Sequence, residues 1–179
     1  AHDAVRPDNR IRTQLNGRAP FIFLSVSKIV IDPTSAGSAT TTTLFASVRL
    51  GNLSSGTSQC AGVPGTITGA LFRSTDSGQT WTQLDVPTGL AGTEQIHDLV
   101  LNPSNANELL VGVRGITQTN AGVWRSTNAL GVTPTFTHIT AGFIQNSPAA
   151  NPQTRRIRLA GGGAGAPSTV YAAVEGTPG

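Results

Sequence analysis

The chain has 179 residues, of which 37% are hydrophobic and 12% charged, and it contains 21 Gly and 11 Pro. The length suits one domain, and the low charged fraction with many turn-forming residues favours an all-β protein over a helical bundle. No apolar run approaches the roughly 18 residues that a membrane-spanning helix needs. The net charge of +3 comes from scattered side chains without interleaved aromatic residues. We therefore expect no membrane span and no nucleic-acid partner.

Taken in chain order, the alternating apolar segments form two complete units of four short strands and the start of a third. In the first unit we expect strands at 28–33, at 44–49, at the start of 69–81 and at 82–84. In the second unit we expect them at 98–103, at 109–114, at the start of 122–136 and at 137–139. In the third unit we expect them at 156–161 and 170–175.

These units recur at intervals of about 58 to 70 residues, and four strands at such a period are typical of β-propeller blades. The whole segment 1–179 is predicted to be a partial β-propeller of about two and a half to three four-stranded blades. Blade 1 is expected at 22–90, blade 2 at 91–148 and an incomplete blade 3 at 149–179. Residues 1–21 form either an N-terminal extension or the outer strand of a preceding blade. Because a propeller closes with four to eight blades, we expect further blades of the same chain or another protein chain to complete it.

The turn after the third strand has a distinctive sequence, Ser74-Thr-Asp-Ser-Gly-Gln-Thr-Trp81. Asp76 can accept hydrogen bonds from turn N–H groups and hydroxyls, Gly78 can supply a positive φ, and Trp81 can pack over the hairpin. A second copy follows the third strand of the second unit, with Asn128 in place of Asp76, one inserted residue before Gly131, and Phe136 in place of Trp81. The predicted stabilising residues are Ser74, Asp76, Gly78, Thr80 and Trp81 in the first copy, and Ser126, Asn128, Gly131 and Phe136 in the second.

This pattern resembles the Asp-box, or BNR repeat, S/T-x-D-x-G-x-T-W, of sialidases, sortilin-type receptors, xyloglucanase-like glycosidases and photosystem assembly factors. The resemblance covers roughly residues 22–175. It implies Asp-box hairpins at the outer edge of each blade, away from the ligand face, and thus a structural role. As a calcium loop the turn is poor, because it holds a single acid.

Two sets of charged residues occupy matching positions in the three units and are candidates for the ligand face. Lys28, Asp98 and Arg156 lie on the first strands, where facing the central channel would place one acid between two bases. Arg49, Arg114 and Glu175 end the second strands and open loops, which often carry binding sites. For both sets the alternative is that the charges are merely solvated.

The residues needed for glycoside hydrolysis are scarce. A sialidase needs an arginine cluster, a Tyr nucleophile and acids, but the single Tyr171 shares the second-strand position of Phe45 and Leu110 and is expected in the core. Xyloglucanase-like enzymes use two Asp residues, and only Asp98 has a comparable position. We therefore expect a recognition or structural module that is extracellular, at the cell surface or periplasmic, with carbohydrate or protein as its partner. The alternative is a glycoside hydrolase whose catalytic residues lie partly outside this segment.

No cofactor or metal is expected from the sequence. The three His residues are too dispersed for a local metal motif, and no Gly-rich phosphate loop opens a helix. Cys60 is the sole cysteine, so it has no disulfide partner within the chain. Modification of Cys60, or of Asn52 in its Asn-Leu-Ser sequon, stays open.

Overall fold

The computed structural model describes residues 24–50, 69–84, 86, 95–114, 121–139, 156–161 and 169–175. Residues 1–21, Asn52 and Cys60 lie outside these ranges, so the expectations for them, and for the blade boundaries, remain predictions. Within the described ranges every regular element is a strand: β1 (Leu24–Ile31), β2 (Leu44–Leu50), β3 (Gly69–Ser74), β4 (Thr82–Leu84), β5 (Gln95–Asn102), β6 (Asn105–Arg114), β7 (Gly122–Ser126), β8 (Thr137–Ile139), β9 (Arg156–Gly161) and β10 (Val170–Glu175).

The strands form antiparallel sheets in which chain neighbours are also sheet neighbours. The orders are β1-β2-β3-β4, β5-β6-β7-β8 and β10-β9. A four-stranded antiparallel meander is the arrangement of a propeller blade. The predicted all-β class is confirmed, and so are the short strands β4, β8, β9 and β10 with their bounds.

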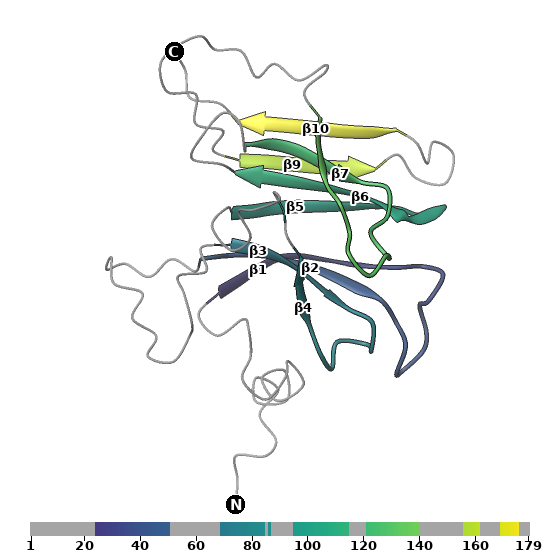
Figure 1. Cartoon of the computed structure of the whole chain (residues 1–179). Helices are drawn as coiled ribbons and strands as arrows, with labels where there is room; N and C mark the ends of the chain where they lie inside the picture. Colours follow the sequence, from purple (N-terminus) through teal and green to yellow (C-terminus); the bar gives the residue numbers. More distant parts are fainter. Residues whose placement is uncertain are drawn as a thin grey trace, which may run out of the picture.

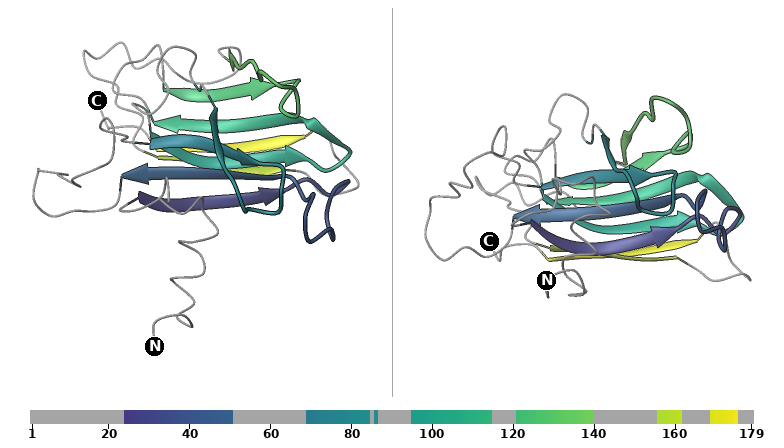
Figure 2. Two further views of the ribbon diagram at one scale, coloured as in Figure 1. Left: turned by 60° about the horizontal axis from the view of Figure 1, so that its bottom comes forward. Right: turned by 90° about the horizontal axis from the view of Figure 1, so that it is seen from below.

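The three sheets are stacked face against face in chain order, as Figure 1 shows from the purple and blue strands through green to yellow. Figure 2 shows the same layering from two further directions. Strand β5, the first of its sheet, contacts β1 and β2 on one side and β9 on the other. The first strands β1, β5 and β9 are therefore neighbours in space although they come from three different sheets.

Apolar side chains pack in both spaces between the sheets. Phe45 and Leu71 of the first sheet pack with Leu99 and Leu109 of the second in one buried cluster. Val100 and Val123, on the opposite face of the second sheet, pack with Ile157 and Leu159 of the third. Full burial of a side chain of this size stabilises the fold by about 1.5–3 kcal/mol.

The prediction that Tyr171 lies in the core is wrong, because 69% of this residue is exposed. Its register position is nevertheless the predicted one, since Phe45, Leu110 and Tyr171 lie opposite Val30, Val100 and Ala160 on the first strands of their sheets. Phe45 faces the second sheet and Leu110 faces the third. Tyr171 faces the side on which the structure describes no further sheet.

Within the described residues, no helix is long and apolar enough to cross a membrane.

Candidate functional site at the inner-strand junction

Strands β1 and β5 each carry an irregularity at the same place. The pairing of β1 with β2 shifts between Val26 and Lys28, and the pairing of β5 with β6 shifts between Ile96 and Asp98. In each strand one extra residue, Ser27 or His97, is accommodated as a β-bulge, which bends the strand and re-aims the following side chain. The sequence match of Lys28 with Asp98 is therefore a true structural equivalence.

Asp98 lies where the three inner strands meet, and it is buried. Its Oδ1 forms an ion pair with Lys28 Nζ of β1 at 2.8 Å and accepts a hydrogen bond from its neighbour Leu99 N at 2.9 Å. Its Oδ2 accepts a hydrogen bond from Leu159 N of β9 at 2.9 Å. A buried carboxylate is costly unless it is paired and hydrogen-bonded, and here both oxygens are satisfied. The carboxylate thus joins strands from all three sheets, and the solvated alternative does not hold for Asp98.

Arg158, which the sequence comparison did not select, is the third member of this set. Lys28 and Asp98 lie three residues before Ile31 and Leu101, which pair with Leu44 and Leu109. The residue of β10 that matches Leu44 and Leu109 in sequence is Val170, and it pairs with Gly161, so the counterpart three residues earlier is Arg158. The alignment of Arg156 with Lys28 and Asp98 is therefore wrong by two residues. Arg158 Nη1 donates a long hydrogen bond of 3.4 Å to the carbonyl oxygen of His97.

The other candidate charges occupy other register positions. Arg156 pairs in register with Glu175, and their side chains form an ion pair at 4.0 Å. Both side chains are more than half exposed, so this pair contributes little to stability. Arg114 lies opposite Gln95 and is half-buried. Arg49 lies opposite Ser25 in register, and its side chain is outside the described set.

A cavity of about 180 Å³ opens beside Asp98, lined by Val26, Ser27, His97, Arg156 and Arg158. Ser27 Oγ lies 2.8 Å from Ser47 Oγ and donates to Ile96 O at 3.0 Å, so the wall formed by β1 is fastened to β2 and β5. Two guanidinium groups line this cavity, and a guanidinium matches the geometry of a carboxylate or phosphate through paired N–H donors. The arrangement is suited to binding an anionic group.

The Ser74–Trp81 turn lies at the other end of the first sheet, next to the β1–β2 turn, since Ser77 N donates to Thr42 O at 3.0 Å. Asp76 Oδ1 accepts hydrogen bonds from Ser74 Oγ at 2.7 Å and Thr80 N at 2.8 Å, and Oδ2 accepts one from Thr80 Oγ1 at 2.5 Å. Burial raises the pKa of Asp76, but hydrogen bonds from Thr80, Ser74 and Gln79 outweigh it and hold the pKa below its ordinary value.

Backbone geometry and Trp81 complete this turn. Gly78 has the predicted positive φ, 87°, and the preceding Ser77 also has a positive φ of 60°. Trp81 Nε1 donates to Gly78 O at 3.0 Å. A Cβ added to Gly78 would also meet the Trp81 ring at 3.7 Å. The indole thus packs over the turn.

The Ser126–Phe136 turn repeats these contacts with an amide. Asn128 Oδ1 accepts hydrogen bonds from Ser126 Oγ at 3.1 Å and Thr135 N at 2.9 Å, as Asp76 does from Ser74 and Thr80. The backbone donor is seven residues after Asn128 but four after Asp76, so the second turn is three residues longer, as the match of Phe136 with Trp81 implies. Gly131 lacks the positive φ of its supposed equivalent Gly78. Instead, Gly131 N donates to Asn128 O at 2.8 Å.

Neither site has the composition of a metal centre. In the parts of the chain that the structure describes, no group of three or more His, Cys, Asp or Glu side chains could hold a metal ion.

The chain was compared with known proteins. No family model matches it, and no curated protein matches it. Among solved structures, it is similar to the crystal structure of the GH74 xyloglucanase from Xanthomonas campestris, with 19% sequence identity and a TM-score of 0.38. The match covers 63% of this chain and 15% of the xyloglucanase chain.

Proposed function

We propose that this chain is a recognition and structural module built from propeller blades with Asp-box turns, acting at the cell surface, outside the cell or in the periplasm. The observation that carries the proposal is the set of contacts made by the Asp98 carboxylate. Both oxygens of this carboxylate are engaged, by Lys28 Nζ, Leu99 N and Leu159 N. A catalytic acid or base must exchange its proton with a substrate within hydrogen-bond reach, whereas Asp98 is committed to holding three strands together.

The two turns support the structural half of the proposal. Asp76 and Asn128 accept equivalent hydrogen bonds at equivalent places in consecutive sheets. An amide can replace the carboxylate because each turn needs an acceptor, not a proton donor or a nucleophile. These are the contacts expected of Asp-boxes that stabilise hairpins.

The cavity beside Asp98 supports the recognition half. It lies toward the beginning of β1, β5 and β9, whereas the Ser74–Trp81 turn lies beside the end of β1. Arg156 and Arg158 supply charged donors, and Ser27 and His97 supply a polar wall. We propose that an acidic carbohydrate binds here through a carboxylate. The alternative, a glycoside hydrolase, would need an additional acid at this site.

The test is a calorimetric titration of the chain with a galacturonic acid trimer and, separately, with a neutral xyloglucan oligosaccharide. We expect saturable binding of the acidic trimer, no release of reducing ends from either sugar, and about tenfold weaker binding by Arg158→Gln, since a hydrogen bond to a charged group contributes about 1.5–3 kcal/mol. Arg125→Gln, on β7 and outside the lining of this cavity, is the matched control. Release of reducing ends would establish the hydrolase, and equal affinity of Arg158→Gln would overturn this site.

A further inference from the structure

His97 is a buried histidine in the wall of the cavity of about 180 Å³ at the inner-strand junction. It is the extra residue of the β5 bulge, and only 6% of it is exposed. Both nitrogen atoms of its ring are buried as well. The lining of this cavity, which we call the anion cavity, is completed by Val26, Ser27, Arg156 and Arg158. An ionisable imidazole thus lies beside the two guanidinium groups that we expect to hold an anion.

The charged side chains around His97 are predominantly positive. Strand β5 contacts β1, β2, β3, β6 and β9. On these five strands and on β5 itself the charged residues are Lys28, Arg49, Arg73, Asp98, Glu108, Arg114, Arg156 and Arg158. Of these, Arg156 and Arg158 line the anion cavity together with His97. Arg49 and Arg114 pair in register with residues near the start of β1 and β5, and they are cations too.

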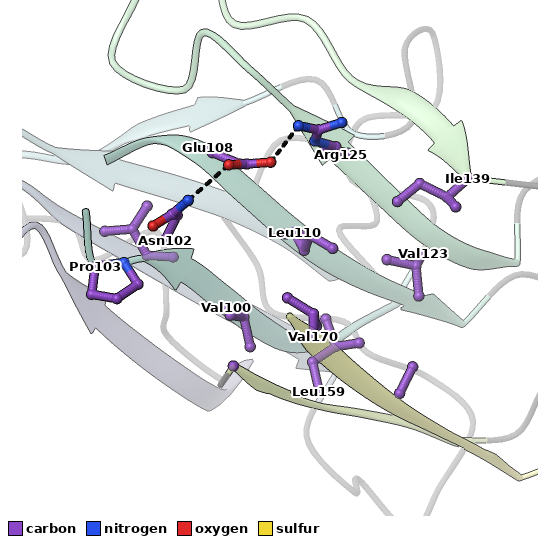
Figure 3. A pocket seen from close by; sticks show the side chains of 13 residues that line it. Val100, Asn102, Pro103, Glu108, Leu110, Val123, Arg125, Ile139, Leu159 and Val170 are labelled. Carbon is purple, nitrogen blue, oxygen red and sulfur yellow. Dashed lines mark hydrogen bonds and ion pairs between the residues drawn. The ribbon is translucent and has the colours of Figure 1, made fainter. Parts of the chain in front are cut away.

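The remaining charges are engaged with partners of their own. Lys28 and Asp98 form an ion pair at 2.8 Å. Arg73 donates hydrogen bonds of 2.8 Å and 2.6 Å to backbone carbonyl groups of the β7–β8 turn. Glu108 pairs with Arg125 at the wall of a separate cavity between the second and third sheets, as Figure 3 shows. The charge that acts on the His97 ring is therefore mainly that of the arginines of the anion cavity.

A proton on His97 is disfavoured before a ligand binds and favoured afterwards. Burial disfavours the charged form of an imidazole, and nearby positive charges disfavour it further. A carboxylate bound between Arg156 and Arg158 supplies an opposite charge beside the ring, which favours the protonated form. Because the ring is buried, this attraction is weakened less by solvent than it would be at the surface.

We propose that the anion cavity binds its ligand together with a proton, which His97 takes up from solvent. The inference rests on the proposed function, because the ligand carboxylate is that of the acidic carbohydrate. The protonated imidazole is more populated in the complex than in the free chain, so the affinity rises as the pH falls. The change is expected around and below about pH 6.5, where an imidazole ordinarily titrates. Well above this pH neither state carries the proton, and the affinity is constant.

The test is a calorimetric titration with the galacturonic acid trimer at pH 5.5 and at pH 7.0. The sugar carboxylates stay ionised at both values, since carboxylic acids titrate near pH 4. We expect about fivefold tighter binding at pH 5.5, and we expect His97→Gln to bind equally at the two values. His138→Gln, on β8 and outside the lining of the anion cavity, is the matched control and should keep the pH dependence. A pH dependence that His97→Gln leaves intact would overturn the proposal.

A second measurement uses the unaltered chain, so it does not depend on how well a variant folds. The imidazole signals of His97 and His138 are followed by nuclear magnetic resonance as the pH is changed, with and without the trimer. We expect the trimer to move the midpoint of the His97 titration to higher pH and to leave that of His138 in place. In the absence of trimer, Arg158→Gln should also raise the His97 midpoint, because it removes a repelling charge. A His97 midpoint that the trimer leaves unchanged would overturn the proposal.

The carbohydrate site and its coupling to a proton fail separately. Trimer binding that is equally tight at pH 5.5 and pH 7.0 overturns the uptake of a proton by His97 and leaves the carbohydrate site in place. Binding that is weaker at pH 5.5 has the same meaning. Absence of trimer binding at both values overturns the two proposals together.

Discussion

Asp98 Oδ2 accepts a hydrogen bond from Leu159 N at 2.9 Å, although the two residues are 61 positions apart and lie in different sheets. The same carboxylate pairs with Lys28 of the first sheet. One buried side chain thus links the inner strands of all three sheets, and it fixes the position of the cavity lined by Arg156 and Arg158.

Replacing Asp98 by Asn should destabilise the chain by about 2–4 kcal/mol, because Lys28 loses its counter-charge and the amide accepts fewer hydrogen bonds than the carboxylate. Urea unfolding at pH 7 measures this change. Glu175→Gln, which alters the exposed pair with Arg156, should change the unfolding free energy by less than about 0.5 kcal/mol. Equal effects of the two substitutions would mean that Asp98 is not buried between the sheets.

Gly112 is a position where the second and third sheets approach closely. A Cβ built there would lie 2.8 Å from Ile157 Cγ2. Gly112→Ala should therefore destabilise the chain by about 1–3 kcal/mol through overpacking, although glycine to alanine within a strand is otherwise favourable. In a double-mutant cycle Ile157→Ala should relieve most of this cost. Additive effects of the two substitutions would contradict the observed packing.

Asp76 should make the stability of the first turn depend on pH. Its pKa in the folded chain is below the ordinary value of 3.8, so its stabilising effect is present above about pH 4 and is lost as the pH falls through the folded pKa. Asp76→Asn keeps one acceptor, as Asn128 does, and should cost less than Asp76→Ala, for which we expect about 1–2 kcal/mol. Urea unfolding at pH 7 and pH 3 measures the difference between the native chain and Asp76→Asn. That difference should shrink at pH 3, and a constant difference would show that the carboxylate charge plays no part.

Protonation of His138 at low pH should change the fluorescence of Trp124. The two rings are stacked with centroids 4.7 Å apart, and His138 Nε2 lies 3.0 Å from Ala121 O. Burial lowers the pKa of His138, and the hydrogen bond to Ala121 opposes this only in part. Because the unfolded chain binds the proton first, stability should fall as the pH drops from about 6.5 toward the folded pKa.

The fluorescence of Trp124, measured in a Trp81→Phe background, should therefore change with a midpoint below pH 6.5. His138→Phe should abolish this titration while it keeps an aromatic ring beside Trp124. A midpoint above pH 6.5 would contradict the burial of His138.

The sequence predicted the sheets well because the repeats preserve strand order, alternation and turn residues. It matched Lys28 with Asp98 correctly because both strands carry the same bulge. It selected Arg156 in place of Arg158 because β9 pairs without a bulge, and a shift of two residues keeps the same residues on the same face. The alternation of apolar residues is unchanged by such a shift and therefore cannot detect it.

The remaining differences arise from contacts between distant segments. Tyr171 has the pattern of a core residue, but its exposure depends on whether another sheet covers it. The three-residue insertion in the second turn places carbonyl groups of Ala129 and Gly131 at Arg73, and only the packing of two sheets shows this contact. The cavity wall formed by Ser27 and His97 depends on the bulges, for which the local sequence gives no signal.

The most direct test of this account is hydrogen exchange of the Leu159 backbone amide, followed by nuclear magnetic resonance. If the inner strands of all three sheets meet at Asp98, this amide should exchange as slowly as the amides of the central strand β6, and Asp98→Ala should accelerate it more than Lys28→Met does. Exchange of the Leu159 amide at the rate of an exposed amide in the unaltered chain would contradict the junction, and with it the position of the proposed ligand site.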